Sequence, residues 1–194
     1  LIGLEHLPAG PALLLNWHLG PARMVKYALR WHGHEVAVVA ASGEKGVDFI
    51  RVDPNGGPEH RAAVALAALK VLREGRKVMV MGDGPLGAGG DVVSVLGHHP
   101  VIRPGIATLA HQRRVPIVPI WSAWRDRRFE VTIEPALTLD FSLPRPAFVS
   151  AAAHTIAAWV DALHRREPTL LTRVLTRWLT RTDVHDRLER ERAE

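Results

Sequence analysis

Short apolar runs alternate with longer stretches of helical periodicity along this chain. Each run is rich in leucine or β-branched residues and is bounded by glycine, proline or charged residues, which is typical of buried strands. The expected strands are 12–16, 35–40, 77–81, 115–121 and 129–133, with shorter ones at 49–52 and 92–95. The expected helices are 22–31, 58–73, 106–112, 147–164 and 168–180.

Strands that alternate with helices predict an α/β fold: a mixed, mostly parallel sheet flanked by helices. The 194 residues fit a single domain with its own core. Within it, residues 147–182 form a helical C-terminal part and residues 183–194 a charged tail. Ligand sites in such folds lie at the carboxyl ends of the strands.

Composition narrows the chemistry that is open to the chain. It has no cysteine, which excludes disulfides, a thiolate nucleophile and a cysteine-based zinc site. The net charge is +5, and arginines gather from residue 165 onward, where they suit anionic lipid, an anionic cofactor, nucleic acid or plain solvation. No apolar run is long enough to span a bilayer, and no signal peptide is visible. The first residue is Leu1, which suggests a fragment or processed chain whose upstream anchor, if present, would lie outside it.

Three loops are candidates for a site because each follows an apolar run. They carry His18, Asp83 and Arg103. If all three runs belong to one sheet, their carboxyl ends share one edge and the loops meet there. A histidine suits a general base, glycines beside Asp83 allow close approach of a substrate, and an arginine suits phosphate.

The other histidines and the tryptophans carry weaker signals. His32, His34, His98 and His99 lie in turns without the spacing of a zinc site, so no metal is expected. Trp17, Trp121 and Trp124 either wall an apolar pocket or pack in the core. Trp159 and Trp178, on the basic C-terminal helices, either lie on anionic lipid or pack against the sheet.

Taken in order, four segments resemble the lysophospholipid acyltransferase superfamily, closest to its lipid A biosynthesis (lauroyl/myristoyl) branch. The likeness covers about residues 11–140. The matching segments are 14–21 (Leu-Leu-Asn-Trp-His-Leu-Gly-Pro), 67–84, 96–97 with 103–110, and 115–120 with 129–135.

The resemblance implies a glycerolipid acyltransferase-like fold and acyl transfer from acyl-CoA or acyl carrier protein to a hydroxyl of a lipid or glycolipid. In that family a His-x4-Asp/Glu motif acts as a dyad in which the histidine is the base. Here the histidine matches His18, but the carboxylate position holds Arg23. Arginine has no acceptor and cannot hold an imidazolium.

Three interpretations of this departure stay open: Asp83 or another carboxylate replaces the partner, His18 acts alone, or the chain binds acyl donor or lipid with weakened or no turnover. We expect His18 and Asp83 to be catalytic and the remaining candidates to bind substrate, the arginines through phosphate or the oxyanion. The binding candidates are Arg23, Gly82, Gly84, Arg103 and Gly105.

The expected partners are the acyl donor, as co-substrate rather than bound cofactor, the lipid or glycolipid acceptor and an anionic membrane surface. The expected location is peripheral, on the cytoplasmic side of the inner or plasma membrane. A nucleic-acid-binding α/β domain is a further alternative, although no recognition motif supports it, and no nucleic acid is expected.

Overall fold

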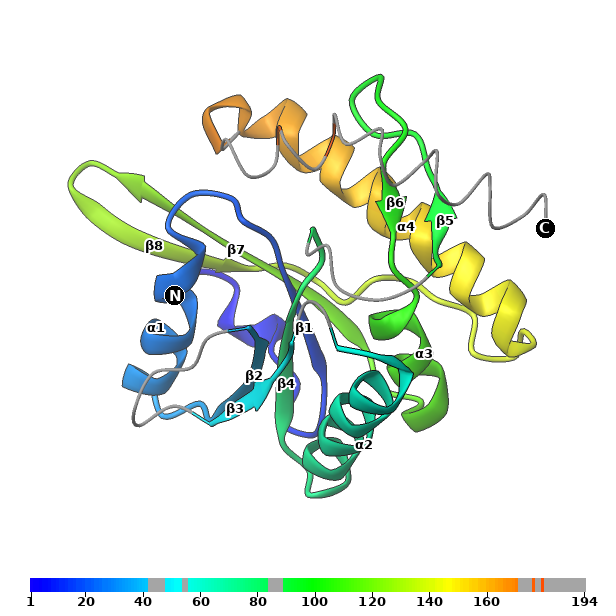
Figure 1. Cartoon of the computed structure of the whole chain (residues 1–194). Helices are drawn as coiled ribbons and strands as arrows, with labels where there is room; N and C mark the ends of the chain where they lie inside the picture. The colour runs from blue at the N-terminus through cyan, green and yellow to red at the C-terminus, as the bar shows by residue number, and fades with distance from the viewer. Residues whose placement is uncertain (42–47, 54–55, 84–88, 171–175, 177–178, 180–194) are drawn as a thin grey trace.

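The computed structural model of the chain describes residues 1–41, 48–53, 56–83, 89–170, 176 and 179 (Figure 1). Its strands are β1 (Leu13–Asn16), β2 (Val36–Ala40), β3 (Phe49–Arg51), β4 (Lys77–Met81), β5 (Asp91–Val92), β6 (Val101–Ile102), β7 (Ile117–Arg125) and β8 (Arg128–Ile133). Its helices are α1 (Val25–Trp31), α2 (Pro58–Arg73), α3 (Gly105–Arg113) and α4 (Arg145–Arg166), with 3₁₀ turns η1 (Leu4–His6), η2 (Ala22–Met24) and η3 (Pro168–Leu170).

Six strands form one sheet in the order β3-β2-β4-β1-β7-β8. The first five strands in that order pair in parallel, and β8 pairs antiparallel with β7. The prediction of a single-domain α/β fold with a mixed, mostly parallel sheet is therefore confirmed. The short strands β5 and β6 pair only with each other, in a separate two-stranded sheet.

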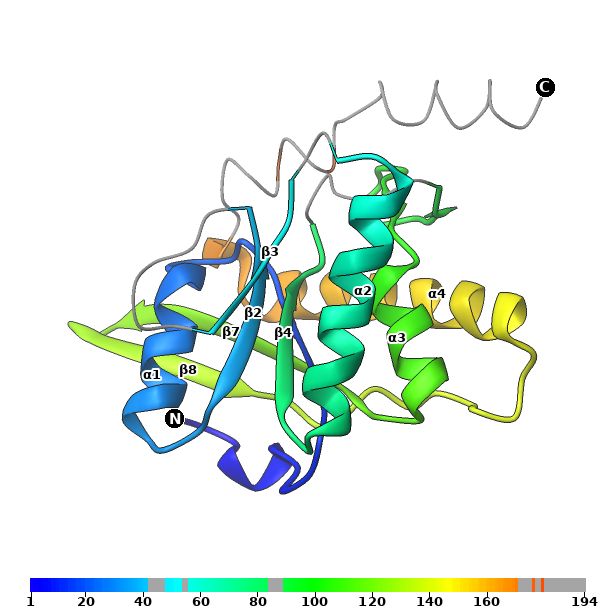
Figure 2. The ribbon, with the colours of Figure 1, turned by 60° about the horizontal axis from the view of Figure 1, so that its bottom comes forward.

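Helices cover both faces of the six-stranded sheet (Figure 2). On one face, apolar side chains of α2, α3 and α4 pack with Leu13 and Leu15 of β1. On the other face, Val25 and Leu29 of α1 pack with Leu14 of the same strand. Because neighbouring side chains of a strand point to opposite faces, Leu13, Leu14 and Leu15 of this central strand are all buried.

Most predicted elements match the structure, and the differences have physical reasons. Helix α2 and strand β4 have the predicted bounds. Strand β7 continues to Arg125, beyond the predicted end at residue 121, because it pairs with β8 along a hairpin that extends past β1. The helix predicted at 22–31 begins as the 3₁₀ turn η2. The predicted helix 168–180 lies mostly outside the described residues, as do Trp178 and the tail 183–194.

Helix α4 packs against the sheet and is part of the core. Trp159 is buried, so of the two interpretations of this residue the structure shows packing. Trp17 and Trp121 are also core residues, whereas Trp124 is exposed. Among the described helices, none combines the length and the apolar character needed to cross a membrane.

Glu134, just after β8, joins β7, β8 and α4 through its carboxylate. One oxygen accepts the indole N–H of Trp121 at 2.9 Å and a guanidinium N–H of Arg166 at 2.7 Å. The other oxygen accepts the indole N–H of Trp159 at 3.0 Å. The Trp159 ring lies 6.0 Å from that of Trp17, between centroids, so this junction supports the segment that leaves β1.

We predict that Glu134→Ala lowers the free energy of unfolding by about 2–4 kcal/mol, because two buried indole N–H groups lose their acceptor. Glu130→Ala, on β8 four residues earlier, is the matched control. It removes only a surface ion pair with Arg125 and is expected to cost less than about 1 kcal/mol. Urea unfolding of both variants measures the difference, and equal losses would contradict the role given to Glu134.

Candidate functional site

The register of β1 and β4 brings two chemically active side chains together. These strands are parallel neighbours in which Asn16 pairs with Met81, the last residue of each strand. His18 and Asp83 come two residues after the last residues of β1 and β4, respectively. The two loops leave the same edge of the sheet side by side, as expected from their sequence positions.

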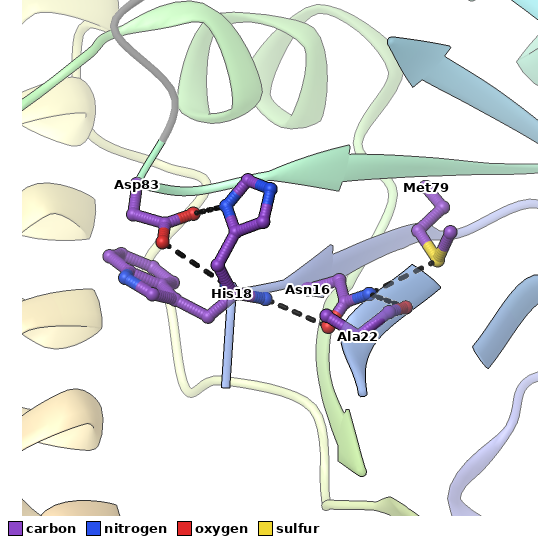
Figure 3. A network of polar contacts seen from close by, with 6 residues as sticks. Asn16, His18, Ala22, Met79 and Asp83 are labelled. Carbon is purple, nitrogen blue, oxygen red and sulfur yellow. Dashed lines mark hydrogen bonds and ion pairs between the residues drawn. The ribbon is translucent and has the colours of Figure 1, made fainter. Parts of the chain in front are cut away.

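His18 and Asp83 are joined by two hydrogen bonds (Figure 3). The ring Nδ1 of His18 lies 2.8 Å from Asp83 Oδ1, and the backbone N–H of His18 donates to Asp83 Oδ2 at 3.1 Å. The Asp83 side chain is 0% exposed, whereas that of His18 is 34% exposed. The carboxylate is therefore enclosed while the ring is partly open to solvent.

This arrangement fixes the tautomer of the imidazole. A carboxylate only accepts hydrogen bonds, so Nδ1 carries the proton that bonds to Asp83. In the neutral ring, Nε2 then keeps a lone pair that can accept a proton. The carboxylate also stabilises the imidazolium after that proton is taken up. Asp83 thus orients the His18 imidazole, which the Arg23 side chain cannot do because it has no hydrogen-bond acceptor.

Asn16 holds the loop that carries His18, a role that the sequence analysis did not assign. Its side chain is fully buried; Oδ1 accepts the N–H of Trp17 at 2.8 Å, and Nδ2 donates to Ala22 O at 3.2 Å. The N–H of Leu19 bonds to Trp17 O at 2.7 Å, which closes a three-residue turn centred on His18. The signal in the sequence was a lone amide at the end of an apolar strand, directly before the Trp-His pair.

Two glycines let backbone and side chains approach closely beside the pair. A Cβ at Gly82 would lie 2.2 Å from a ring carbon of Trp17, so only glycine leaves room for the indole. Gly20 has φ of +56°, and a Cβ there would lie 2.2 Å from Ser122 O. These contacts seat the His18 loop on β7 and the Asp83 loop on Trp17.

The remaining candidates occupy different places. Arg23 is exposed on η2, and Gly105 is exposed at the start of α3. Arg103 is half-buried and donates to Gly89 O at 2.7 Å. It follows β6, which lies outside the six-stranded sheet, so the condition that all three apolar runs belong to one sheet is not met for the Arg103 loop. Gly84 lies outside the described residues.

In the part of the chain that the structure describes, no three His, Cys, Asp or Glu side chains gather in a way that could hold a metal ion. No protein-family model matches the chain, and no curated protein matches it.

We predict that ¹⁵N NMR, recorded while the His18 imidazole is neutral, finds the ring proton on Nδ1 and none on Nε2. The reason is that Asp83 accepts a hydrogen bond from Nδ1. In Asp83→Ala this preference is lost, since the ring no longer has the carboxylate that selects the tautomer. A His18 ring protonated on Nε2 in the unsubstituted protein would contradict the hydrogen-bond assignment.

Proposed function

We propose that this chain is an acyltransferase of the lysophospholipid type, which moves a fatty acyl group from acyl-CoA or acyl carrier protein to a hydroxyl of a lipid or glycolipid. The observation that carries the proposal is the His18–Asp83 pair, with a 2.8 Å bond between ring and carboxylate at the carboxyl edge of a parallel sheet. The ordered sequence resemblance supplies the class of reaction, which the pair alone does not.

The proposed reaction uses His18 first as base and then as acid. Nε2 removes the proton of the acceptor hydroxyl while the oxygen attacks the thioester carbonyl carbon. The resulting tetrahedral oxyanion collapses, the carbon–sulfur bond breaks, and the departing thiolate takes the proton back from Nε2. The products are an ester and a free thiol. Asp83 stays ionised and holds the ring throughout.

The buried carboxylate of Asp83 favours catalysis over the alternative of a binding protein without turnover. That alternative rests on Arg23, which stands where the family has its carboxylate. Asp83 reaches the ring from β4 instead, so the chain retains an oriented base without a carboxylate at position 23. A buried carboxylate is costly to keep unless it bonds to a partner, and His18 is that partner.

The same proposal includes the partners and location of the enzyme. The donor enters as a co-substrate, and the acceptor is an amphiphile that resides in a bilayer. A peripheral position on the cytoplasmic side of the inner or plasma membrane suits both, because the donors are soluble thioesters and the acceptor is membrane-bound. Arg103, which has a fixed positive charge, is proposed to contact phosphate of the substrates.

We predict that His18→Ala lowers kcat for thiol release from lauroyl- or palmitoyl-CoA by about 10²–10⁴-fold in the presence of lysophospholipid, because general-base catalysis is lost. His154→Ala, an exposed histidine on α4, is the control and is expected to keep the wild-type rate. Equal rates for His18→Ala and wild type, or no turnover by either protein with CoA and carrier-protein donors, would refute the proposed acyltransferase activity.

A second prediction concerns Arg23. Because Asp83 already holds the ring, Arg23→Glu, which restores the family pattern, should not raise the rate of thioester turnover above wild type. The measurement is kcat/KM for the same donor and acceptor. A gain of tenfold or more would show that the orienting carboxylate is missing from the native chain.

A further inference from the structure

The outward side of η2 and α1 carries an unusual combination of exposed residues. Val25 and Leu29 point into the core, so the opposite side of this helix faces solvent. Met24 and Trp31 are 44% and 88% exposed, and their spacing of seven places them on one stripe. Arg23 is exposed beside that stripe. Residues 21–34 contain no Asp or Glu.

The free end of the β7–β8 hairpin adds similar residues on the same side of the molecule. Ile120 packs with Val25 and Leu29, and by the two-residue alternation of a strand Trp124 points to that same face of the sheet. Trp124 is 65% exposed. Both ribbon views show the hairpin end and α1 at the same end of the molecule (Figures 1 and 2).

Arginines also cover the turn of this hairpin. Arg127 and Arg128 are exposed, with Asp126 as the acidic residue between Arg125 and Arg127. Asp126 and Arg127 both have positive φ, 47° and 64°. Positive φ at both central residues is the conformation that a two-residue type I′ hairpin turn requires, so the turn holds these side chains at the tip of the hairpin.

We propose that Met24, Trp31 and Trp124, together with Arg23, Arg127 and Arg128, form a surface that docks on an anionic lipid bilayer; we name it the α1–hairpin surface. The proposal rests on the proposed function for the identity of the amphiphile, but its evidence is separate. Tryptophan has an amphipathic ring suited to the headgroup region, and each arginine is attracted to the negative charge of an anionic leaflet.

The arrangement favours a bilayer over other occupants. The residues project from a helix and a hairpin end, where tryptophan and methionine can enter an interface while arginines meet phosphates. The surface is also continuous with the site, because η2 follows the His18 loop directly and Gly20 packs on Ser122 of β7. This location gives Arg23 a role in place of the family's carboxylate.

The test is sedimentation of the full chain with vesicles, without acyl donor. The vesicles are phosphatidylcholine alone or phosphatidylcholine mixed with phosphatidylglycerol. The protein is expected to bind the mixed vesicles, less tightly as salt is added, and to bind neutral ones weakly. Arg23→Gln should weaken binding about fivefold and Trp31→Ala about tenfold, because they remove one charge and one buried ring respectively.

Two control variants make comparable changes on α2: one removes a charge and the other an exposed apolar side chain. Arg73→Gln removes an exposed arginine, and Leu66→Ala removes an apolar side chain that is 63% exposed. Both should bind within about twofold of wild type, since they lie outside the α1–hairpin surface. Circular dichroism of all variants checks that they are folded.

Several results would overturn the proposal. Equal binding to neutral and mixed vesicles would contradict it, and so would equal losses of binding in the surface and control variants. If vesicle binding is absent, self-association that Trp31→Ala abolishes would assign the surface to a second copy of the chain. Oligonucleotide binding that Arg23→Gln abolishes would assign it to nucleic acid. The outcome is separate from that of the proposed function. Vesicle binding without thioester turnover refutes only the proposed acyltransferase activity. Turnover on a soluble acceptor without vesicle binding refutes only the proposal that the α1–hairpin surface docks on a bilayer.

Discussion

The site depends on the parallel pairing of β1 with β4 in one register. Because Asn16 pairs with Met81, the residues that leave the two strands advance together, and Trp17 meets Gly82 just before His18 meets Asp83. A slip of one residue would turn Leu13 and Leu15 away from their core cluster and bring different side chains to the loops. The large apolar area buried on both faces of β1 therefore also holds the imidazole and carboxylate in contact.

Burial of the Asp83 carboxylate makes its hydrogen bonds to His18 necessary. The side chain is fully enclosed, so it loses most of its hydration and must be stabilised by protein donors. The backbone N–H and the ring of His18 supply such donors. The residues around the pair restrict its movement: Asn16 fixes the loop on one side, and the Trp17–Trp159 contact, supported by Glu134, fixes the other. The site is thus organised before any substrate arrives.

Hydropathy patterning predicted most of the fold because the central strands are mostly apolar and the longest helices follow glycine or proline residues. Helix α2 begins at Pro58 as predicted, and β4 follows the predicted glycine stop. The pattern could not show that β6 belongs to a separate sheet, since two residues carry no information about their pairing partner. Likewise, the extension of β7 depends on a partner strand from later in the chain.

The candidate site was only partly predictable for the same reason. The positions of His18 and Asp83 after neighbouring apolar runs suggested that they meet, but their bond depends on strand order, which spacing does not determine. The roles of Asn16 and Glu134 arise from contacts across the sheet and were not anticipated. Arg23 lies on the exposed side of η2, while Asp83 holds the ring.

A double-mutant cycle in thioester turnover tests most directly whether His18 and Asp83 act as one unit. It compares kcat/KM for wild type, His18→Ala, Asp83→Ala and the double variant. If the carboxylate acts through the imidazole, each single substitution lowers the rate at least about tenfold, and the double variant is within about twofold of His18→Ala alone. If the two losses multiply instead, or if Asp83→Ala keeps the wild-type rate, the pair is not the catalytic unit.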